Sequence, residues 1–278
     1  EEERFDIVIC EYAFQSKVFR LFDDSVLKVV DTIDCYSNNE VSGNEEIFGK
    51  VSYFFKEDEA NCLNRADVVI AIQDEEAKYF SKIINEDKKI VTIGEIVNLN
   101  NSPNMRGDRK NLFFIGFVNN PNYSGLNFFI NQVFPKLIKK YPDCRLVIAG
   151  KICDHIRGGQ GIVKLGFVKD IDKAYSMADV VICPLFFGTG LKIKAVEALG
   201  YSKPLIITDF GLKGIEKGKN KAFLVANNPD EFVEQISKVF DNKEIYEKLS
   251  KNAYDFMKKY NKENIGKLKE IFDQNINQ

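Results

Sequence analysis

The sequence has no tryptophan, a single histidine (His155) and no long apolar run among its 278 residues. One histidine cannot build a histidine-ligated metal centre, because carboxylates would have to supply the remaining ligands. The longest apolar stretches, such as residues 68–72, are far shorter than the roughly 20 residues that span a membrane. No basic and then apolar block opens the sequence, so we expect no secretory signal and a cytoplasmic location.

The six cysteines are scattered, and no two of them form a Cys-x-x-Cys pair. Cys10, Cys144 and Cys183 lie in or beside apolar, strand-like segments, where a thiol behaves as a small hydrophobic group. This spacing predicts neither a disulfide framework nor a zinc site.

The formal net charge is only −2, but it is unevenly distributed. Residues 1–105 hold 22 acidic and 11 basic side chains, whereas residues 106–278 hold 19 and 28. An acidic first half is a poor match for nucleic acid. The basic second half is either a solvated lysine-rich surface or, in part, a field that attracts an anionic ligand such as a nucleoside diphosphate.

Short β-branched runs alternate with helical patterns along the chain, which is typical of βαβ units and a mainly parallel sheet. Strands are expected at 6–10, 26–31, 67–72, 89–93, 112–116, 145–149, 162–165, 179–183, 204–207 and 222–226. Helices are expected at 46–65, 74–84, 123–140, 190–200, 229–240 and 243–275.

The Asn-rich stretch 98–110 breaks both periodicities and separates the two charge regimes, so we expect it to link two domains. The predicted fold class is α/β with two Rossmann-like domains. The first would be a short, incomplete domain over residues 1–105, and the second a complete one over 106–260. Residues 261–278 would form a C-terminal helix.

A doubly wound sheet of strand order 3-2-1-4-5-6 binds ligands beyond the carboxyl ends of strands 1 and 4. In the second domain this rule selects the loops 116–122 and 184–190. Gly188 and Gly190 would let the backbone approach a ligand, and a helix from Leu191 onward would direct free N–H groups toward a diphosphate. Lys192, in the first turn, would be a direct phosphate ligand. Alternatively, the glycines only turn the chain and the lysine is solvated.

Two carboxylates are further candidates. Glu197 lies in the otherwise apolar segment 195–199, where a buried carboxylate needs a partner. A ribose diol would supply that partner, but a salt bridge to a lysine or a place on the wet face of the helix would also explain the residue. Asp34 follows a strand and is either a cleft residue or a helix or turn cap.

Residues 187–200, Phe-Gly-Thr-Gly-Leu-Lys-Ile-Lys-Ala-Val-Glu-Ala-Leu-Gly, and the following Lys-Pro-Leu-Ile-Ile-Thr at 203–208 resemble a known family. They are similar to the donor-site helix and next strand of the retaining GT-B glycosyltransferases of family 4, or group 1, which are related to sucrose synthase and bacterial mannosyltransferases. Further similarities lie at 114–116, 121–122, 142, 146–150, 166–168 and 178–184, so the resemblance covers the second domain almost end to end.

This resemblance implies a GT-B architecture and transfer of a sugar from a nucleoside diphosphate sugar to a glycan or lipid-linked acceptor. It implies no metal cofactor, and a cytoplasmic place at the inner face of the membrane. The donor-binding residues would be Gly116, Asn119, Asn122, Gly188, Thr189, Gly190, Leu191, Lys192 and Glu197.

The family's Glu-x7-Glu pattern is only half present. Glu197 matches the second glutamate, which binds the donor ribose, but Thr189 stands where the first glutamate lies near the transferred sugar. We therefore take Thr189 and Asp34 as the candidate catalytic residues. The usual Arg and Lys of the loop after strand 1 are replaced by Phe117 and the Asn-rich residues 119–122.

The first domain is similar to the latter part of the family's acceptor domain at residues 5–10, 29–34 and 64–72. Members begin earlier, which implies that strands are missing from the first sheet. Their last helices commonly cross back to the first domain, so the same is implied for the C-terminal helix here.

Two other functions stay open. One is a non-transferring relative, such as a sugar-nucleotide epimerase or a phosphorylase-like enzyme, although these rely on additional histidines. The other is a non-catalytic module that binds a nucleotide sugar or a partner transferase, to which Thr189 and the short first domain point.

Overall fold

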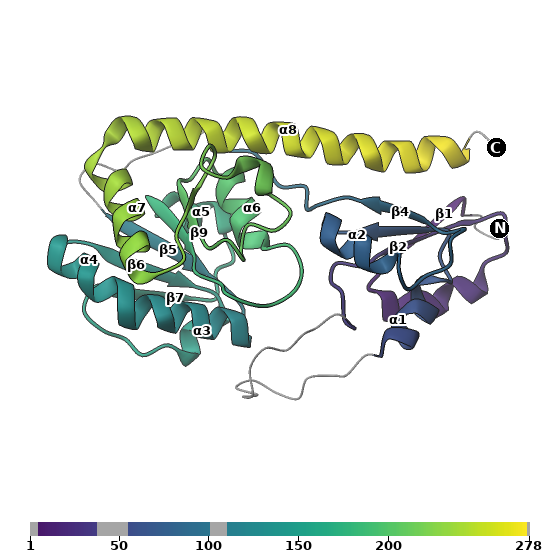
Figure 1. Cartoon of the computed structure of the whole chain (residues 1–278), viewed down its shortest axis with the longest axis horizontal. Helices are drawn as coiled ribbons and strands as arrows, with labels where there is room; N and C mark the ends of the chain where they lie inside the picture. The colour runs from purple at the N-terminus through teal and green to yellow at the C-terminus, as the bar shows by residue number, and fades with distance from the viewer. Residues whose placement is uncertain (1–4, 38–54, 101–109, 277–278) are drawn as a thin grey trace.

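The computed structural model describes residues 5–37, 55–100 and 110–276. Two parallel sheets lie next to each other along the long axis of the molecule, and one long helix runs over both (Figure 1). The expected helix at 46–65 and the expected linker at 98–110 fall partly outside the described residues, at 46–54 and 101–109.

The first sheet has four parallel strands in the order β1-β2-β3-β4. The strands are β1 (Ile7–Glu11), β2 (Leu27–Asp31), β3 (Val68–Ala71) and β4 (Lys89–Thr92). Between them lie the 3-10 helix η1 (Ala13–Leu21) and the helices α1 (Lys56–Leu63) and α2 (Asp74–Phe80). Every residue of β3 is buried, as expected for a continuous apolar run in a parallel sheet that is covered on both faces.

The second sheet has six parallel strands in the order β10-β9-β8-β5-β6-β7. The strands are β5 (Asn111–Ile115), β6 (Arg145–Ala149), β7 (Ile162–Gly166), β8 (Val180–Cys183), β9 (Leu205–Ile207) and β10 (Leu224–Val225). Counted from β5 and read from the β7 edge, this order is 3-2-1-4-5-6, which confirms the predicted topology.

Apart from α5, which was not predicted, the helices of the second domain follow the predicted segments. They are α3 (Asn120–Phe128), α4 (Phe134–Lys140), α5 (Ile171–Ser176), α6 (Ile193–Gly200) and α7 (Pro229–Asp241), with short 3-10 turns η3 (Lys151–His155) and η4 (Glu216–Gly218). The stretch expected to be one helix at 123–140 is interrupted by a π-helical turn, η2 (Phe129–Val133).

The start of α6 differs from the prediction. The helix begins at Ile193 rather than Leu191, and Lys192 is its N-cap, with φ −82° and ψ 85°. Gly188 and Gly190 have φ of 111° and 70°, values that keep the preceding loop out of the helical conformation. Lys192 therefore lies just before the first helical turn.

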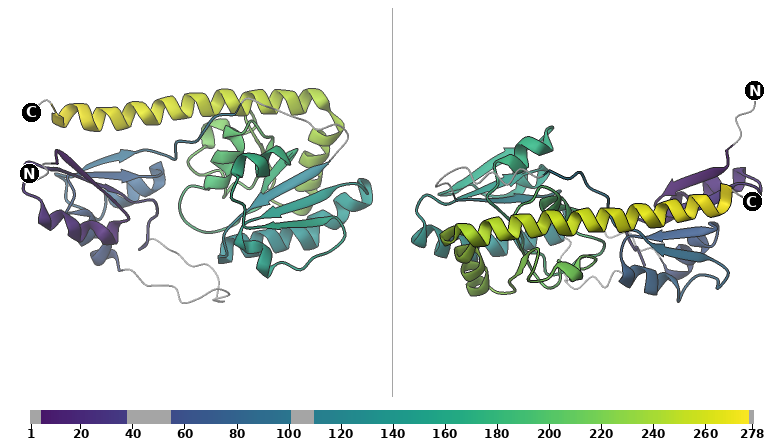
Figure 2. Two further views of the ribbon diagram at one scale, coloured as in Figure 1. Left: turned by 180° about the vertical axis from the view of Figure 1, so that it is seen from behind. Right: turned by 90° about the horizontal axis from the view of Figure 1, so that it is seen from above.

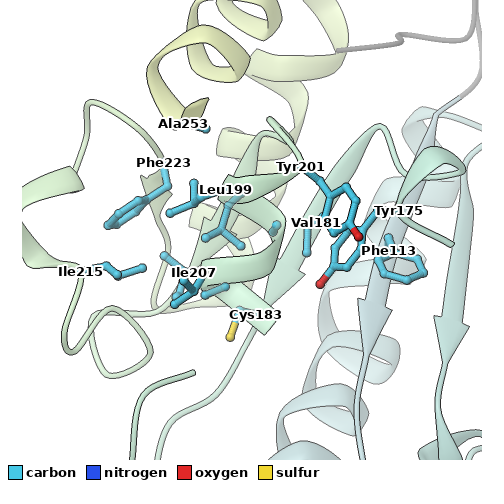
Figure 3. Close-up of a cluster of buried hydrophobic side chains, with 14 of the residues drawn as sticks. Phe113, Tyr175, Val181, Cys183, Leu199, Tyr201, Ile207, Ile215, Phe223 and Ala253 are labelled. Atoms are coloured by element: carbon cyan, nitrogen blue, oxygen red, sulfur yellow. The ribbon is translucent and has the colours of Figure 1, made fainter. Parts of the chain in front are cut away.

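The main core of the second domain packs α6 against the centre of its sheet. Val181 and Ile207 from neighbouring strands lie near Leu199 of α6, and Phe113 of β5 packs against Tyr175 (Figure 3). The side chains of Phe113, Val181, Leu199 and Ile207 are all buried. Next to them the rings of Tyr175 and Tyr201 stack, with centroids 4.4 Å apart and planes 14° apart. All six cysteines are buried free thiols. This rigid packing holds the N-terminal end of α6 at the carboxyl edge of the sheet.

The helix α8 (Lys243–Ile276) follows the second domain and then runs along the first (Figure 2). Asn264 accepts a hydrogen bond from the backbone N–H of Gly94 at 3.1 Å, and Lys267 donates one to the carbonyl of Thr92 at 2.7 Å. Farther along, Ile271 is fully buried against Val29 and other residues of the first sheet. One helix thus contacts both domains and the segment between them. No helix in the described ranges combines the length and the apolar character needed to cross a membrane.

The position of Ile271 generates a stability prediction. Ile271→Ala should lower the free energy of unfolding by about 2–4 kcal/mol, because it removes buried methylene groups and leaves a cavity under α8. Urea denaturation followed by circular dichroism would measure this change. The matched variant Ile265→Ala, on the same helix at a side chain that is 39% exposed, should cost less than about 1 kcal/mol. Equal losses in both variants would contradict the role given to α8.

Candidate functional site

A cleft of about 880 Å³ lies between the two domains, at the carboxyl ends of both sheets. The first domain lines it with Asp34, Cys35, Gln73, Glu75 and Glu76. The second domain lines it with residues 117, 119–122, 185–189, 191–194, 210 and 213. A Cβ atom placed on Gly188 would lie 3.0 Å from the ring of Pro121, so the two loops face each other closely, as predicted.

The loop before α6 contains glycines with positive φ, a backbone conformation that other residues rarely adopt. Gly190 adopts φ 70°, and a Cβ atom there would come within 3.3 Å of the Asp34 carboxylate. The expectation was that this glycine would admit a ligand. In the structure, the first domain lies close to the backbone of this glycine.

Lys192 holds this loop in place. Its ammonium donates hydrogen bonds to the carbonyls of Thr189 and Gly190, both at 2.8 Å. Burial lowers its pKa, since the side chain is almost removed from water. Two of its three N–H groups are therefore engaged by the backbone, and the residue still lines the cleft.

The opposite loop is organised by asparagines. Asn119 is the N-cap of α3 and accepts the backbone N–H of Asn122 at 2.9 Å, while the side-chain amide of Asn122 donates to the carbonyl of Phe117 at 2.9 Å. Gly116 lies behind them, because a Cβ atom there would be 3.2 Å from the Asn122 amide. Asn119 and Gly116 thus shape the loop, and Asn119 and Asn122 also line the cleft.

Lys194 connects the two loops. Its ammonium donates to Oδ1 of Asn122 and lies 4.0 Å from the centroid of the Phe114 ring. Burial lowers the pKa of Lys194 to about 8. Lys192 and Lys194 together give the second-domain side of the cleft a positive character.

The first-domain side is acidic. Glu76 is only 4% exposed, and its Oε1 accepts hydrogen bonds from the backbone N–H of Gly190 at 3.1 Å and from Gln73 at 3.3 Å. Its Oε2 is buried, and no hydrogen-bond partner for it exists in the described part of the chain. Burial, followed by repulsion from Asp34, raises the pKa of Glu76 to about 7.

The two candidate catalytic residues meet across the cleft. The Thr189 hydroxyl donates a hydrogen bond to the carboxylate of Asp34, and the backbone N–H of Cys35 donates another at 3.0 Å. Burial raises the pKa of Asp34. Of the donor-site candidates, Gly188, Thr189, Leu191 and Lys192 line the cleft together with these residues.

Three candidates are placed differently from expectation. Gly116 lies behind the loop, and the N–H of Gly190, expected to face a phosphate, is bound by Glu76. Glu197 does not line the cleft, because its carboxylate accepts a hydrogen bond from the hydroxyl of Tyr175 at 2.9 Å. Its burial is thus satisfied by a tyrosine, a partner that the sequence reasoning did not consider, and burial raises its pKa.

Sequence reasoning missed Glu76 and Gln73, and it did not predict that Lys194 lines the cleft and binds Asn122. Residues 73–76 follow β3, so they lie at the carboxyl edge of the first sheet. The rule that selected the loops of the second domain would have found them had it been applied to the first.

The chain is similar to several known proteins. The family model described as "Glycosyl transferases group 1" matches residues 109–242. The "Alpha-monoglucosyldiacylglycerol synthase" of Acholeplasma laidlawii is 34% identical over 146 residues, which are 48% of this chain and 36% of the synthase.

Two solved structures share the fold. TarM has a TM-score of 0.73 at 17% identity, over 96% of this chain and 54% of its own. HepE from Anabaena, solved in complex with UDP-glucose, has a TM-score of 0.66 at 15% identity, over 95% of this chain and 79% of its own. The chain thus spans about half the length of TarM and little more than a third of the synthase.

Two parallel α/β sheets that face each other across a cleft, with a long helix over both, define the GT-B class of fold. Residues 109–242, which hold the six-stranded sheet and α6, are the part of the chain that matches the group 1 glycosyltransferases.

The pKa of Glu76 generates a prediction for stability against pH. Because the native pKa is about 7 and the ordinary value is 4.5, the native protein holds a proton in this range that the unfolded chain has lost. Ionisation of Glu76 at higher pH therefore costs stability. Glu76→Gln should unfold with a free energy roughly 1–3 kcal/mol higher than the parent at pH 8, and the gain should fade toward pH 5.

Urea denaturation at pH 5, 6, 7 and 8 would test this prediction. The exposed Glu86→Gln is the matched control and should change the free energy of unfolding by less than about 0.5 kcal/mol at every pH. A Glu76→Gln effect that is the same at pH 5 and pH 8 would show that the carboxyl group does not titrate in this range.

Proposed function

We propose that the chain is a retaining glycosyltransferase that moves a sugar from a nucleoside diphosphate sugar to a glycan or lipid-linked acceptor. The observation that carries the proposal is the polarity of the cleft, in which Lys192 and Lys194 face Asp34 and Glu76 across the two domains. A nucleotide sugar has the matching polarity, with an anionic diphosphate next to a neutral, hydroxyl-rich ring. The Anabaena relative solved with UDP-glucose supports a donor of this class.

The diphosphate would bind on the basic side. Lys192 has an N–H group beyond those that hold the loop, and Lys194 would be kept protonated by a nearby anion despite its pKa of about 8. As the acceptor oxygen bonds to the anomeric carbon, the bond from that carbon to the phosphate oxygen breaks, and the diphosphate leaves with the proton of the acceptor hydroxyl. The two ammonium groups and the N-terminal end of α6 would stabilise the charge that develops, so we propose that no metal is needed.

Asp34 and Thr189 would lie beside the transferred sugar, where the domains meet. Glu197, which is half-buried and accepts a hydrogen bond from Tyr175, would bind the donor ribose where the nucleoside extends beyond the residues that line the cleft. In this arrangement the second domain recognises the nucleotide, and the first domain presents the acceptor.

A lipid-linked acceptor is supported by the surface of the first domain. Phe14, Val18 and Leu21 of η1 are exposed, with Leu21 81% exposed, and the basic Lys17 and Arg20 lie among them. Exposed apolar and basic residues on one short helix suit the surface of an anionic membrane. The relative that makes a glucosyl diacylglycerol agrees with this choice of acceptor.

A non-catalytic sugar-nucleotide module is the second candidate. It is favoured by Thr189 in place of a glutamate and by Glu76, whose carboxylate occupies the Gly190 N–H that a phosphate was expected to bind.

The phosphate role of Lys192 generates a binding prediction. Lys192→Ala should weaken the affinity for UDP or GDP roughly ten- to a hundredfold, since a charge-assisted hydrogen bond contributes about 1.5–3 kcal/mol. The affinity for uridine or guanosine should change much less. Isothermal titration calorimetry would measure both. The exposed Lys248→Ala is the matched control, and equal weakening of nucleoside and nucleotide binding would refute a phosphate contact.

A transfer assay separates the enzyme from the module. With UDP-[14C]glucose or GDP-[14C]mannose, the enzyme should release nucleoside diphosphate and label an acceptor, and EDTA should leave the rate unchanged within about twofold. Diacylglycerol vesicles should accept label better than soluble glycans do. Binding without turnover on any acceptor would identify the module, and a loss of activity in EDTA that Mg²⁺ restores would overturn the metal-free proposal.

A further inference from the structure

Glu76 occupies an unusual place at the corner of the cleft where α2 meets the loop before α6. One carboxylate oxygen is anchored, because the Gly190 N–H donates to it from the other domain at 3.1 Å. The second oxygen is buried and has no hydrogen-bond partner within the described ranges, although the residue lines the cleft. A buried acceptor of this kind is costly unless a ligand supplies a donor.

The charges around Glu76 indicate which kind of ligand group could donate a hydrogen bond to its Oε2. Asp34 is close enough to raise the pKa of Glu76 by repulsion, and a Cβ atom placed on Gly190 would lie 3.3 Å from the Asp34 carboxylate. Two carboxyl groups at one corner repel a phosphate. Sugar hydroxyls are neutral donors, and a carboxylate accepts them readily.

The basic groups are arranged in the complementary way. Lys192 points its ammonium at the carbonyls of Thr189 and Gly190, and Lys194 lies toward Asn122 on the second-domain side. A nucleotide sugar whose diphosphate is held by these lysines would place its sugar against Thr189, Asp34 and Glu76.

We propose that Glu76 is a sugar-binding residue of the donor site. Its Oε2 accepts a hydrogen bond from a hydroxyl group of the transferred sugar, while Oε1 remains on the Gly190 amide. This inference rests on the proposed function. It means that Glu76 of the first domain supplies a carboxylate next to Thr189, where the second domain lacks the family's first glutamate. The sugar would then be recognised only where the two domains meet.

The test is the ratio between the dissociation constants of a nucleotide sugar and of its parent nucleoside diphosphate. Titration calorimetry at pH 8 would use the pairs UDP-glucose with UDP and GDP-mannose with GDP. For the pair that the parent protein prefers, Glu76→Gln should weaken the nucleotide sugar about tenfold and change the nucleoside diphosphate less than about twofold. The amide keeps the size of the side chain but accepts a weaker, neutral hydrogen bond. Glu86→Gln should change neither constant.

Each other outcome has a definite meaning. If Glu76→Gln leaves the ratio unchanged, whether both constants stay the same or both weaken together, Glu76 is structural and the inference is wrong, while the proposed function stands. If the parent protein binds none of the four nucleotides, the proposed function fails and this inference fails with it. If Glu76→Gln does not fold, Glu76→Asp retains the charge but withdraws the carboxylate, and it should show the same selective loss for the nucleotide sugar.

Discussion

The contact between Glu76 and the backbone N–H of Gly190 is the interaction on which the arrangement of the cleft depends. It joins the first turn of α2 to the loop before α6, and it requires glycine at position 190, since a side chain there would meet the Asp34 carboxylate. A salt bridge between Lys213 and Glu75, at 2.8 Å, crosses the same boundary, but both side chains are partly exposed and the pair adds little to stability. Glu76 therefore both lines the cleft and holds the two domains together.

The helix α8 complements this contact from the outside of the molecule. Asn261 exchanges hydrogen bonds with the backbone of Val97, and Asn264 binds that of Gly94, so the segment between the sheets is attached to the helix. Burial of Ile271 under the same helix ties its far end to the first sheet. A helix of 34 residues is stiff compared with a loop, and it limits the positions that the two domains can take relative to each other.

The two sides of the cleft carry opposite charges, so a ligand with one anionic end would bind in one orientation. The acidic first half and the basic second half of the sequence meet here as Asp34 and Glu76 on one wall and Lys192 and Lys194 on the other. Burial works against every one of these charges, as the raised pKa of both acids and the lowered pKa of both lysines show. Ionisable groups with shifted pKa values that gather in a cleft are typical of functional sites.

The sequence by itself determined the α/β class, the order of the six strands, and the two loops of the second domain that line the cleft. These features follow from local periodicity, and parallel βαβ connections allow few topologies. Only the tertiary structure decided which side chains face each other. Glu76 and Gly190 are 114 residues apart, and Glu197 turned to Tyr175 because two helices pack together around that hydroxyl group. Pairings of this kind depend on how separate elements approach one another in space, which no local pattern encodes.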